Sequence, residues 1–595
     1  MDESLNQESA TASDLLVFDP RRTLAQALRW AWARRVAVLC AALLLGMGFQ
    51  LLGAVARKSI TNDEIVHIPA GYYHLVAGEF QLNNEHPPLV KMWAALPLLL
   101  VQPVEPPAPT TVDENFMERT WGFHERFWHA NQARFQTVTF WPRVMMIPIT
   151  LALGVLIFVF ARKLFGETAA LISVGLFVLE PTVLAHGRIV HTDVPSALVY
   201  LLFFFTLYKY SEAPGLKRAL VLALAFSVAL LTKFSMLVLV PVLAIYLLAR
   251  LFINRRDPRQ RSQVLFHSGL ITAVVLFLVN AAYYFQHPVL EASDVRWVAM
   301  RSPALLGFVT TGIRVLSKII PTYYLFGVYN IELHNHDGHA TSLLGQYGDR
   351  GWWYYFPVAF ALKTTIPFLL LAISALGWAV WRFIRRDSRF LWLVVPVGVY
   401  LAISLTSHIN IGIRHFLPVY PFLLIAGGAL LAQLLHNRRK VGVAVLVVLF
   451  GWMTFEAVRT FPDYTPYMNE LAYGHPHWYY LSDSNVEWGD DVGALAAYLK
   501  ARGETKVSAA LSAGWSTLGR YGVDYLDMVT LPPDKTPETR YVAIGASFLN
   551  GSLIPGDENV VGRRAFERTN LFARYRNRQP EAVFGNSIYL FREHE

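Results

Sequence analysis

Long apolar stretches alternate with short polar connections along most of this chain. An α-helix rises about 1.5 Å per residue, so about 20 apolar residues cross the hydrocarbon core of a bilayer. The pattern therefore predicts a polytopic α-helical membrane protein with about 11 transmembrane helices. The expected spans are 36–56, 143–161, 168–185, 194–210, 216–231, 234–252, 264–285, 353–381, 389–406, 413–435 and 440–458.

Basic residues are concentrated in alternate connections between these stretches. Cytoplasmic loops of membrane proteins carry an excess of Lys and Arg. Applied here, the rule predicts a cytoplasmic N-terminal tail, 1–35, and two large outer loops, 57–142 and 286–352. The basic connections that fix this orientation include 162–163, 250–261, 382–389 and 438–440.

The apolar segment 87–101 is an exception within the first outer loop. It is shorter than a span and begins with Pro87 and Pro88. If it crossed the membrane, all later loops would change sides. We therefore expect an interfacial or re-entrant helix there.

Residues 459–595 differ in pattern from the preceding membrane module, 36–458. They contain one helix-like stretch and several short runs with the character of strands, so we expect a small extracytoplasmic α/β domain. The helix-like stretch is 492–502, and the runs are 507–511, 540–544 and 587–591.

Composition agrees with a membrane protein. The chain is 54% hydrophobic and 16% charged, whereas soluble domains carry about 25% charged residues. Its formal net charge is +9, but the basic residues lie largely in short loops, which suits orientation in a membrane better than binding of nucleic acid. The single cysteine, Cys40, excludes a disulfide framework within the chain and a zinc site built on cysteines.

The most informative polar feature is the acidic pair Asp63-Glu64, just beyond the first apolar stretch. Carboxylates at the mouth of a membrane bundle are costly to desolvate, so they indicate a functional site. Asp193 stands at a second junction on the same predicted side. The alternative for each carboxylate is a helix cap that offsets the helix dipole.

Cations and histidines gather on that same predicted side. Two separated carboxylates among cations suit a reaction on a phosphorylated lipid, because a carboxylate can take a proton from an attacking hydroxyl and cations or a bound metal can stabilise the departing phosphate. Snorkelling to lipid head groups is the alternative for the cations, and a solvated loop is favoured for the histidines of 334–339. The gathered residues include His67, His86, Arg143, His191, Lys233, His334, His339, Arg414 and His415.

Several motifs resemble one known family when taken in order. They are Asp63-Glu64, the His-Pro-Pro-Leu stretch within 85–91, Arg143 at the start of the second span, 191–195, 413–421 and 482–491. Over about residues 30 to 495 the chain resembles the GT-C superfamily of polyprenyl-phosphate-dependent glycosyltransferases, in the bacterial branch of protein O-mannosyltransferases and aminoarabinose transferases.

The resemblance implies a role for each motif. Asp63 would be the general base of an inverting transfer, Glu64 would position the acceptor or the base, and Asp193 would be the second acidic site. A divalent cation, Mg or Mn, would be held by Asp63 and Asp193 if a metal takes part. The implied residues for donor phosphate or other substrate binding are His86, Lys91, Arg143, His191, Lys233, Lys363, Arg414, His415, Asp483 and Asn485.

The resemblance also implies the partners. The donor would be a sugar on a polyprenyl phosphate, and the acceptor a lipid, glycan or protein at the periplasmic side of a bacterial inner membrane. The chain lacks the β-trefoil insert of eukaryotic protein O-mannosyltransferases, and His86 stands where aminoarabinose transferases have lysine. A transporter or flippase of a polyprenyl-linked lipid and a non-catalytic assembly subunit stay open as alternatives.

Overall fold

The computed structural model describes residues 35–106, 121–531, 537–554 and 570–594. The expected N-terminal tail, 1–35, therefore lies outside the described residues except for Arg35.

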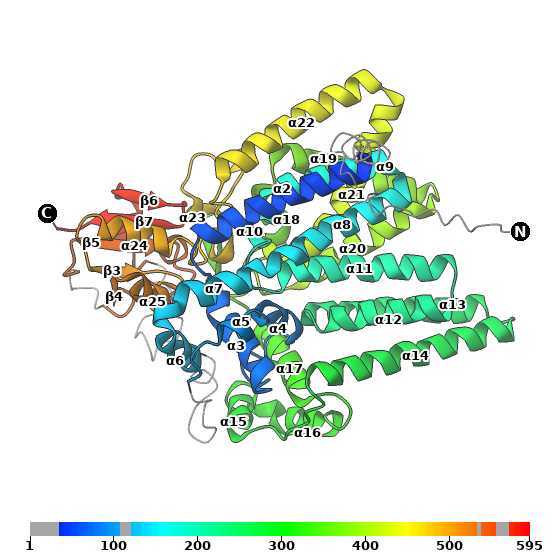
Figure 1. Cartoon of the computed structure of the whole chain (residues 1–595), viewed down its shortest axis with the longest axis horizontal. Coiled ribbons are helices and arrows are strands. Elements are labelled where there is room, and N and C mark those ends of the chain that lie inside the picture. Colours follow the sequence, from blue (N-terminus) through cyan, green and yellow to red (C-terminus); the bar gives the residue numbers. More distant parts are fainter. Residues whose placement is uncertain (1–34, 107–120, 532–536, 555–569, 595) are drawn as a thin grey trace, which may run out of the picture.

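Nine helical segments within the described residues are long and apolar enough to cross a membrane, which confirms the predicted multi-pass helical fold. Their axes run roughly side by side (Figure 1). The segments are α2 (Arg35–Arg57), η2 with α7 and α8 (Gln132–Arg134, Phe135–Val144 and Met146–Phe165), α11 (Asp193–Glu212), η3 with α13 (Phe234–Val238 and Leu239–Ile253), α14 (Pro258–Ala282), α19 (Ile366–Ile384), η5 with α20 (Ser388–Phe390 and Leu391–Thr406), η6 with α21 (Ile413–Val419 and Tyr420–Asn437) and α22 (Arg439–Thr460).

Two of the expected spans are shorter helices. For 168–185, α9 (Glu167–Leu179) has 13 residues and is followed after Glu180 by α10 (Pro181–His186). Proline suits the first turn of a helix and cannot continue a preceding one without losing a hydrogen bond. For 216–231, α12 (Leu216–Leu230) has 15 residues.

The expected continuous span 353–381 is instead two helices. α18 (Tyr355–Lys363) ends at Thr364, whose extended backbone, like that of Thr365, separates it from α19. Pro367 then lies in the first turn of α19, where its missing N–H costs no hydrogen bond. Only α19 is long enough to span.

The centre of the bundle is formed by α21 and α11. In the apolar part of the η6–α21 segment 78% of the residues are buried, whereas in that of the η3–α13 segment 17% are buried. Gly428 permits the close approach of α21 to α9, because a Cβ there would lie 2.5 Å from the carbonyl oxygen of Ala169. Small residues let membrane helices pack closely in this way.

The two expected outer loops fold into short elements that gather toward one end of the bundle (Figure 1). The segment 87–101 contains two short helices, neither long enough to span. The first loop contributes α3 (Asn62–Val76), α4 (Leu89–Ala95), α5 (Leu98–Val101) and α6 (Phe123–Ala130), and the second contributes α15 (Ala292–Arg301), η4 (Pro303–Leu305), α16 (Leu306–Leu316), α17 (Thr322–Asp337), β1 (Thr341–Leu343) and β2 (Gln346–Gly348).

A five-stranded sheet forms the core of the C-terminal region, in the order β4-β3-β5-β7-β6. β3 pairs in parallel with β4 and β5, and β7 pairs antiparallel with β5 and β6. The central strand β5 is buried along its whole length, as expected when both faces of a sheet are covered. The strands are β3 (Lys506–Ala510), β4 (Asp524–Asp527), β5 (Tyr541–Gly545), β6 (Ala582–Phe584) and β7 (Ile588–Arg592), and α24 (Val492–Lys500) precedes them.

Candidate active site

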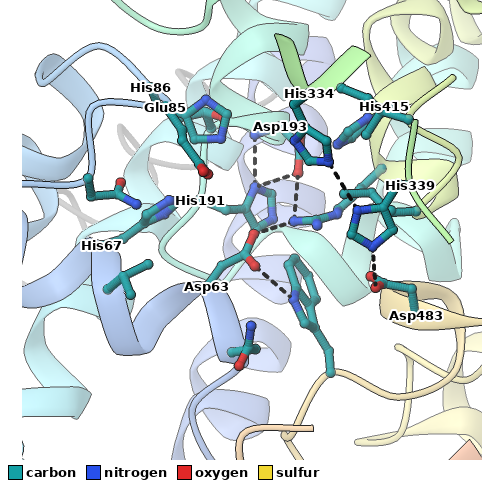
Figure 2. A pocket seen from close by; sticks show the side chains of 18 of the residues that line it. Asp63, His67, Glu85, His86, His191, Asp193, His334, His339, His415 and Asp483 are labelled. Carbon is teal, nitrogen blue, oxygen red and sulfur yellow. Dashed lines mark hydrogen bonds and ion pairs between the residues drawn. The ribbon is translucent and has the colours of Figure 1, made fainter. Parts of the chain in front are cut away.

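A cavity of about 310 Å³ lies where the outer-loop helices, the bundle and the C-terminal region meet. Asp63 from α3 and Asp193 from α11 line it (Figure 2). Arg414 from η6 and Trp488 from the segment 482–491 also belong to its lining. These residues come from segments far apart in the sequence, so the cavity exists only in the assembled fold.

The two predicted carboxylates are joined through a shared arginine. Arg414 Nη1 donates a hydrogen bond to Asp63 Oδ2 and lies 3.8 Å from Asp193 Oδ2. Lys233 Nζ donates to the other oxygen of Asp193. Each carboxylate is thus paired with a cation, and both cations face the cavity.

Both carboxylates stand at the start of a helix. Asp63 lies in the first turn of α3, and Asp193 is the first residue of α11. Helix N-termini favour negative charge because their first N–H groups lack helical partners. The positions of both side chains therefore agree with the helix-cap alternative. That alternative does not explain their ion pairs with Arg414 and Lys233.

His191 is held beside Asp193 in one tautomer. Its Nδ1 accepts a hydrogen bond of 2.8 Å from the backbone N–H of Asp193, so its proton is on Nε2. Burial lowers the pKa of His191 to about 4, even though Asp193 opposes the shift. His191 is therefore an uncharged donor at neutral pH.

Asp63 is ionised in this arrangement. Its burial would raise its pKa, but the positive charge of Arg414 outweighs that effect and leaves the pKa below its ordinary value. Burial lowers the pKa of His67 to about 4. His67, one turn further along α3, is therefore uncharged at neutral pH.

A second polar group occupies another part of the wall. His334 Nε2 and His339 Nδ1 are 3.0 Å apart, and His339 Nε2 lies 3.8 Å from Asp483 Oδ2. Burial raises the pKa of Asp483 to about 6, against the effect of Arg414, and burial lowers the pKa of His339 to about 3. Two of the histidines expected in a solvated loop therefore line the cavity, whereas His336 is exposed.

The structure brings most of the predicted site residues to the cavity and leaves others elsewhere. Five are not part of its lining, and their contacts explain why. Those that line it are Asp63, His86, His191, Asp193, Lys233, Arg414, His415 and Asp483.

Glu64 is used in the framework behind the cavity. Its Oε2 accepts a hydrogen bond of 2.7 Å from Thr61 N, and its Oε1 accepts one of 2.9 Å from Val190 N. Arg143 Nε lies 3.3 Å from the same Oε1. Arg143 Nη1 donates to the carbonyl oxygens of Val55 and Lys58, at 3.2 and 2.8 Å. Glu64 and Arg143 therefore connect α2, α3 and the loop 187–192, which contains Val190.

The other three predicted residues bind backbone groups. Lys91 Nζ donates to the carbonyl oxygens of Asn83 and His86. Lys363 Nζ donates to the carbonyl oxygens of Thr465 and Asn485, each at 2.6 Å. The Asn485 side chain accepts a bond of 2.9 Å from Ile413 N, next to Arg414. None of these groups is directed to the cavity, because each already meets buried backbone partners.

Several cavity residues were not among the predicted site residues, and His67, His339 and Trp488 are three of them. His67 stands four residues after Asp63, and this spacing places both on one helix face. The helical spacing could therefore have predicted that His67 lies beside Asp63 in the site. His339 belonged to the histidine-rich loop. Trp488 lies within the motif 482–491, but nothing in the sequence pattern connects it with Asp63.

The pair of carboxylates does not fit a metal ion in this structure. Within the described residues, no group of three or more His, Cys, Asp or Glu side chains is arranged to hold one. The oxygens of Asp63 and Asp193 that face each other meet the Arg414 guanidinium, so the cation between them is supplied by the chain.

The cavity carries more negative than positive side chains. Asp63, Glu85, Asp193 and Asp483 line it, against Lys233 and Arg414. With these groups ionised, the lining has an excess of two negative charges, histidines apart. Binding several further anions there would be costly, because opposite charges are needed to offset desolvation.

A comparison with protein families finds one match. Residues 135–283 match the family described as dolichyl-phosphate-mannose-protein mannosyltransferase. The matched stretch contains Asp193 and Lys233 of the cavity. No curated protein matches the chain.

Solved membrane transferases resemble the structure at low sequence identity. ArnT from Cupriavidus metallidurans, bound to undecaprenyl phosphate, gives a TM-score of 0.45 with 12% identity over 93% of this chain and 97% of that chain. The oligosaccharyltransferase of Archaeoglobus fulgidus, in complex with Zn and sulfate, gives 0.44 with 9% identity over 86% and 68%. The S. cerevisiae protein O-mannosyltransferase Pmt1-Pmt2 complex, bound to the sugar donor, gives 0.29 with 18% identity over 41% and 33%.

The fold and the site define a multi-pass membrane protein with a charged cavity toward one end of its helical bundle. The family match over residues 135–283 confirms the predicted resemblance to polyprenyl-phosphate-dependent glycosyltransferases.

Proposed function

We propose that this protein transfers one sugar from a polyprenyl-phosphate carrier to an acceptor hydroxyl, with Asp63 as general base and inversion at the sugar carbon. The observation that carries the proposal is the chain of ion pairs from Asp63 through Arg414 and Asp193 to Lys233 in one cavity. It joins a group that can accept a proton to cations that can bind a phosphate.

The donor phosphate is the natural partner of the two cations. A sugar phosphodiester carries one negative charge, and charge-assisted hydrogen bonds from Arg and Lys are among the strongest that proteins make. When Arg414 binds this phosphate, it gives up its hydrogen bond to Asp63 Oδ2. That oxygen then becomes free for the acceptor.

The reaction is a single displacement. The acceptor hydroxyl oxygen forms a bond to the anomeric carbon, and its proton passes to Asp63 Oδ2. The bond between that carbon and the phosphate oxygen breaks, and the electron pair stays with the lipid phosphate. Arg414 and Lys233 stabilise the added charge on this leaving group.

The charge of the cavity favours a hydroxyl over a phosphate as acceptor. The lining already has an excess of negative side chains, and the donor brings a further negative charge. A phosphorylated acceptor would add more charge, and both cations of the described lining, Lys233 and Arg414, would already bind the donor phosphate. An uncharged hydroxyl on a lipid, glycan or protein needs no such partner.

The loop charges and the bacterial character of the motifs support a location in a bacterial inner membrane, with the cavity at the periplasmic face. The lipid tail of the donor would lie along the bundle, with its phosphate at the membrane surface. The charged groups of the cavity lie toward one end of the bundle, which favours transfer over transport.

A transfer assay tests this function. Purified protein in lipid is given a panel of radiolabelled polyprenyl-phosphate sugars with paired acceptors, each a hydroxylated glycan or lipid and its phosphate ester. Label is expected to move to the hydroxylated member of a pair. Movement of intact carrier across the bilayer, without sugar transfer, would support a flippase instead. Carrier binding with neither event would support an assembly subunit.

A further inference from the structure

Trp488 contacts both groups that the proposed reaction uses. Its Nε1 donates a hydrogen bond of 3.2 Å to Asp63 Oδ1. The Arg414 guanidinium lies over its ring, 4.2 Å from the centroid. The indole is 2% exposed and lines the cavity. It therefore meets the carboxylate on the oxygen that Arg414 does not bind.

The backbone around Trp488 is bound to the start of α3. The N–H of Asn62 donates to the carbonyl oxygen of Trp488 at 2.8 Å, and the N–H of Ser59 donates to that of Asp490 at 2.9 Å. The backbone that carries the indole is therefore tied to the helix that presents Asp63.

The same segment is bound to the C-terminal region. Glu487 accepts hydrogen bonds of 2.7 Å from Ser512 N and 2.9 Å from Ser547 N, one on each carboxylate oxygen. Asp491 accepts a bond of 2.6 Å from the Ser587 hydroxyl. The position of the indole thus depends on the docking of the sheet onto the bundle.

We propose that Trp488 is a positioning residue for both Asp63 and Arg414, through which the C-terminal region completes the active site. This inference rests on the proposed function. The indole N–H fixes Oδ1 of Asp63, so that Oδ2 remains directed at the acceptor when Arg414 moves to the donor phosphate. The indole face holds the guanidinium by a cation–π contact, which keeps it within reach of that phosphate.

Two substitutions separate the two contacts. Trp488→Phe keeps an aromatic face under Arg414 and removes the N–H, whereas Trp488→Leu removes both. Trp128→Phe is the matched control, because Trp128 is also buried and its Nε1 donates 2.8 Å to the Ile65 carbonyl oxygen of the same helix α3. Trp128 does not line the cavity.

Steady-state kinetics give the first readout. Trp488→Phe is expected to lower kcat by about tenfold with an unchanged donor KM, because a hydrogen bond to a charged group is lost. It also removes a donor that stabilises the ionised carboxylate, so the acid limb of the kcat profile moves to higher pH. Trp488→Leu is expected to raise the donor KM as well. A kcat of Trp488→Phe within twofold of Trp128→Phe overturns the inference.

Binding of sugar-free polyprenyl phosphate gives a readout that does not need turnover. Trp488→Leu is expected to bind this probe about tenfold more weakly than Trp128→Phe, because a cation–π contact at a desolvated site is lost. Equal binding overturns the role assigned to the indole face. If the wild type moves no sugar from any donor, the proposed function fails, and this binding comparison still decides the inference.

Discussion

Arg188 and Asp490 form an ion pair of 2.9 Å between the membrane module and the C-terminal region, and neither side chain has any exposed surface. Asp490 also accepts a hydrogen bond of 2.8 Å from the Thr465 hydroxyl. Removing one partner of a buried pair leaves an uncompensated charge, which is more costly than the pair itself is favourable. The pair thus ties the docking of the C-terminal region to a fully buried charge match.

Asp490→Ala is therefore expected to reduce the free energy of unfolding by about 3–5 kcal/mol. The measurement is thermal unfolding of purified protein in lipid, together with protease cleavage between bundle and sheet. Glu581→Ala is the control, because Glu581 pairs with Arg592 nearer the surface, where pairs contribute about 0–1 kcal/mol. Equal losses in the two variants would contradict the account.

Arg414 is expected to act mainly on the donor. Arg414→Ala removes the guanidinium that meets both carboxylates, so kcat/KM for the donor should fall by about 10²–10³-fold. Arg414→Lys keeps the charge but not the planar fork, and it should recover part of the loss. A variant with normal donor kinetics would show that the phosphate binds elsewhere.

Lys363 is expected to act on stability and not on catalysis. Its Nζ donates hydrogen bonds to two buried carbonyl oxygens, and Lys363 does not line the cavity. Lys363→Met should lower the melting temperature, because both carbonyls lose their donor, while the donor KM of the folded fraction stays unchanged. A raised donor KM at normal stability would contradict this account and support the role in phosphate binding that the family resemblance implies for Lys363.

Asp483 should make stability depend on pH in an identifiable window. Burial raises its pKa in the folded protein to about 6, from about 3.9 in an unfolded chain. The folded state then binds more protons in this range, so the stability associated with this group is present below about pH 4 and is lost as the pH rises through about 6.

Asp483→Asn removes that dependence. The melting temperature of the wild type minus that of the variant should fall between about pH 4 and 6 and stay level above that range. Asp524→Asn, on the exposed end of β4, is the control for the loss of one carboxylate. A level difference for Asp483→Asn would mean that its carboxyl titrates normally.

The sequence predicts the membrane module because lipid requires long apolar helices, and this requirement leaves a direct pattern. The break at Thr364 and Thr365 was not predicted, because the residues on both sides are equally apolar. The loop charges placed Asp63, Asp193 and Arg414 on one side of the membrane, and the family resemblance supplied the role of each.

The side chains of Lys91 and Lys363 could not be placed from the sequence. Their partners are backbone carbonyls of distant segments, and no sequence pattern records such contacts. Trp488 is a similar case, since its contact with Asp63 joins residues 425 positions apart. Tertiary packing decides which polar groups reach the cavity.

The most direct test of the central claim is single-turnover transfer by Asp63→Asn with a saturating polyprenyl-phosphate sugar. Asp387→Asn is the matched control, because Asp387 also pairs with arginines but lies outside the cavity, between α19 and α20. The account predicts a loss of at least about 10²-fold in the rate of transfer for Asp63→Asn, with donor still bound, and a normal rate for Asp387→Asn. A rate for Asp63→Asn within a few-fold of wild type would contradict the assignment of Asp63 as the base.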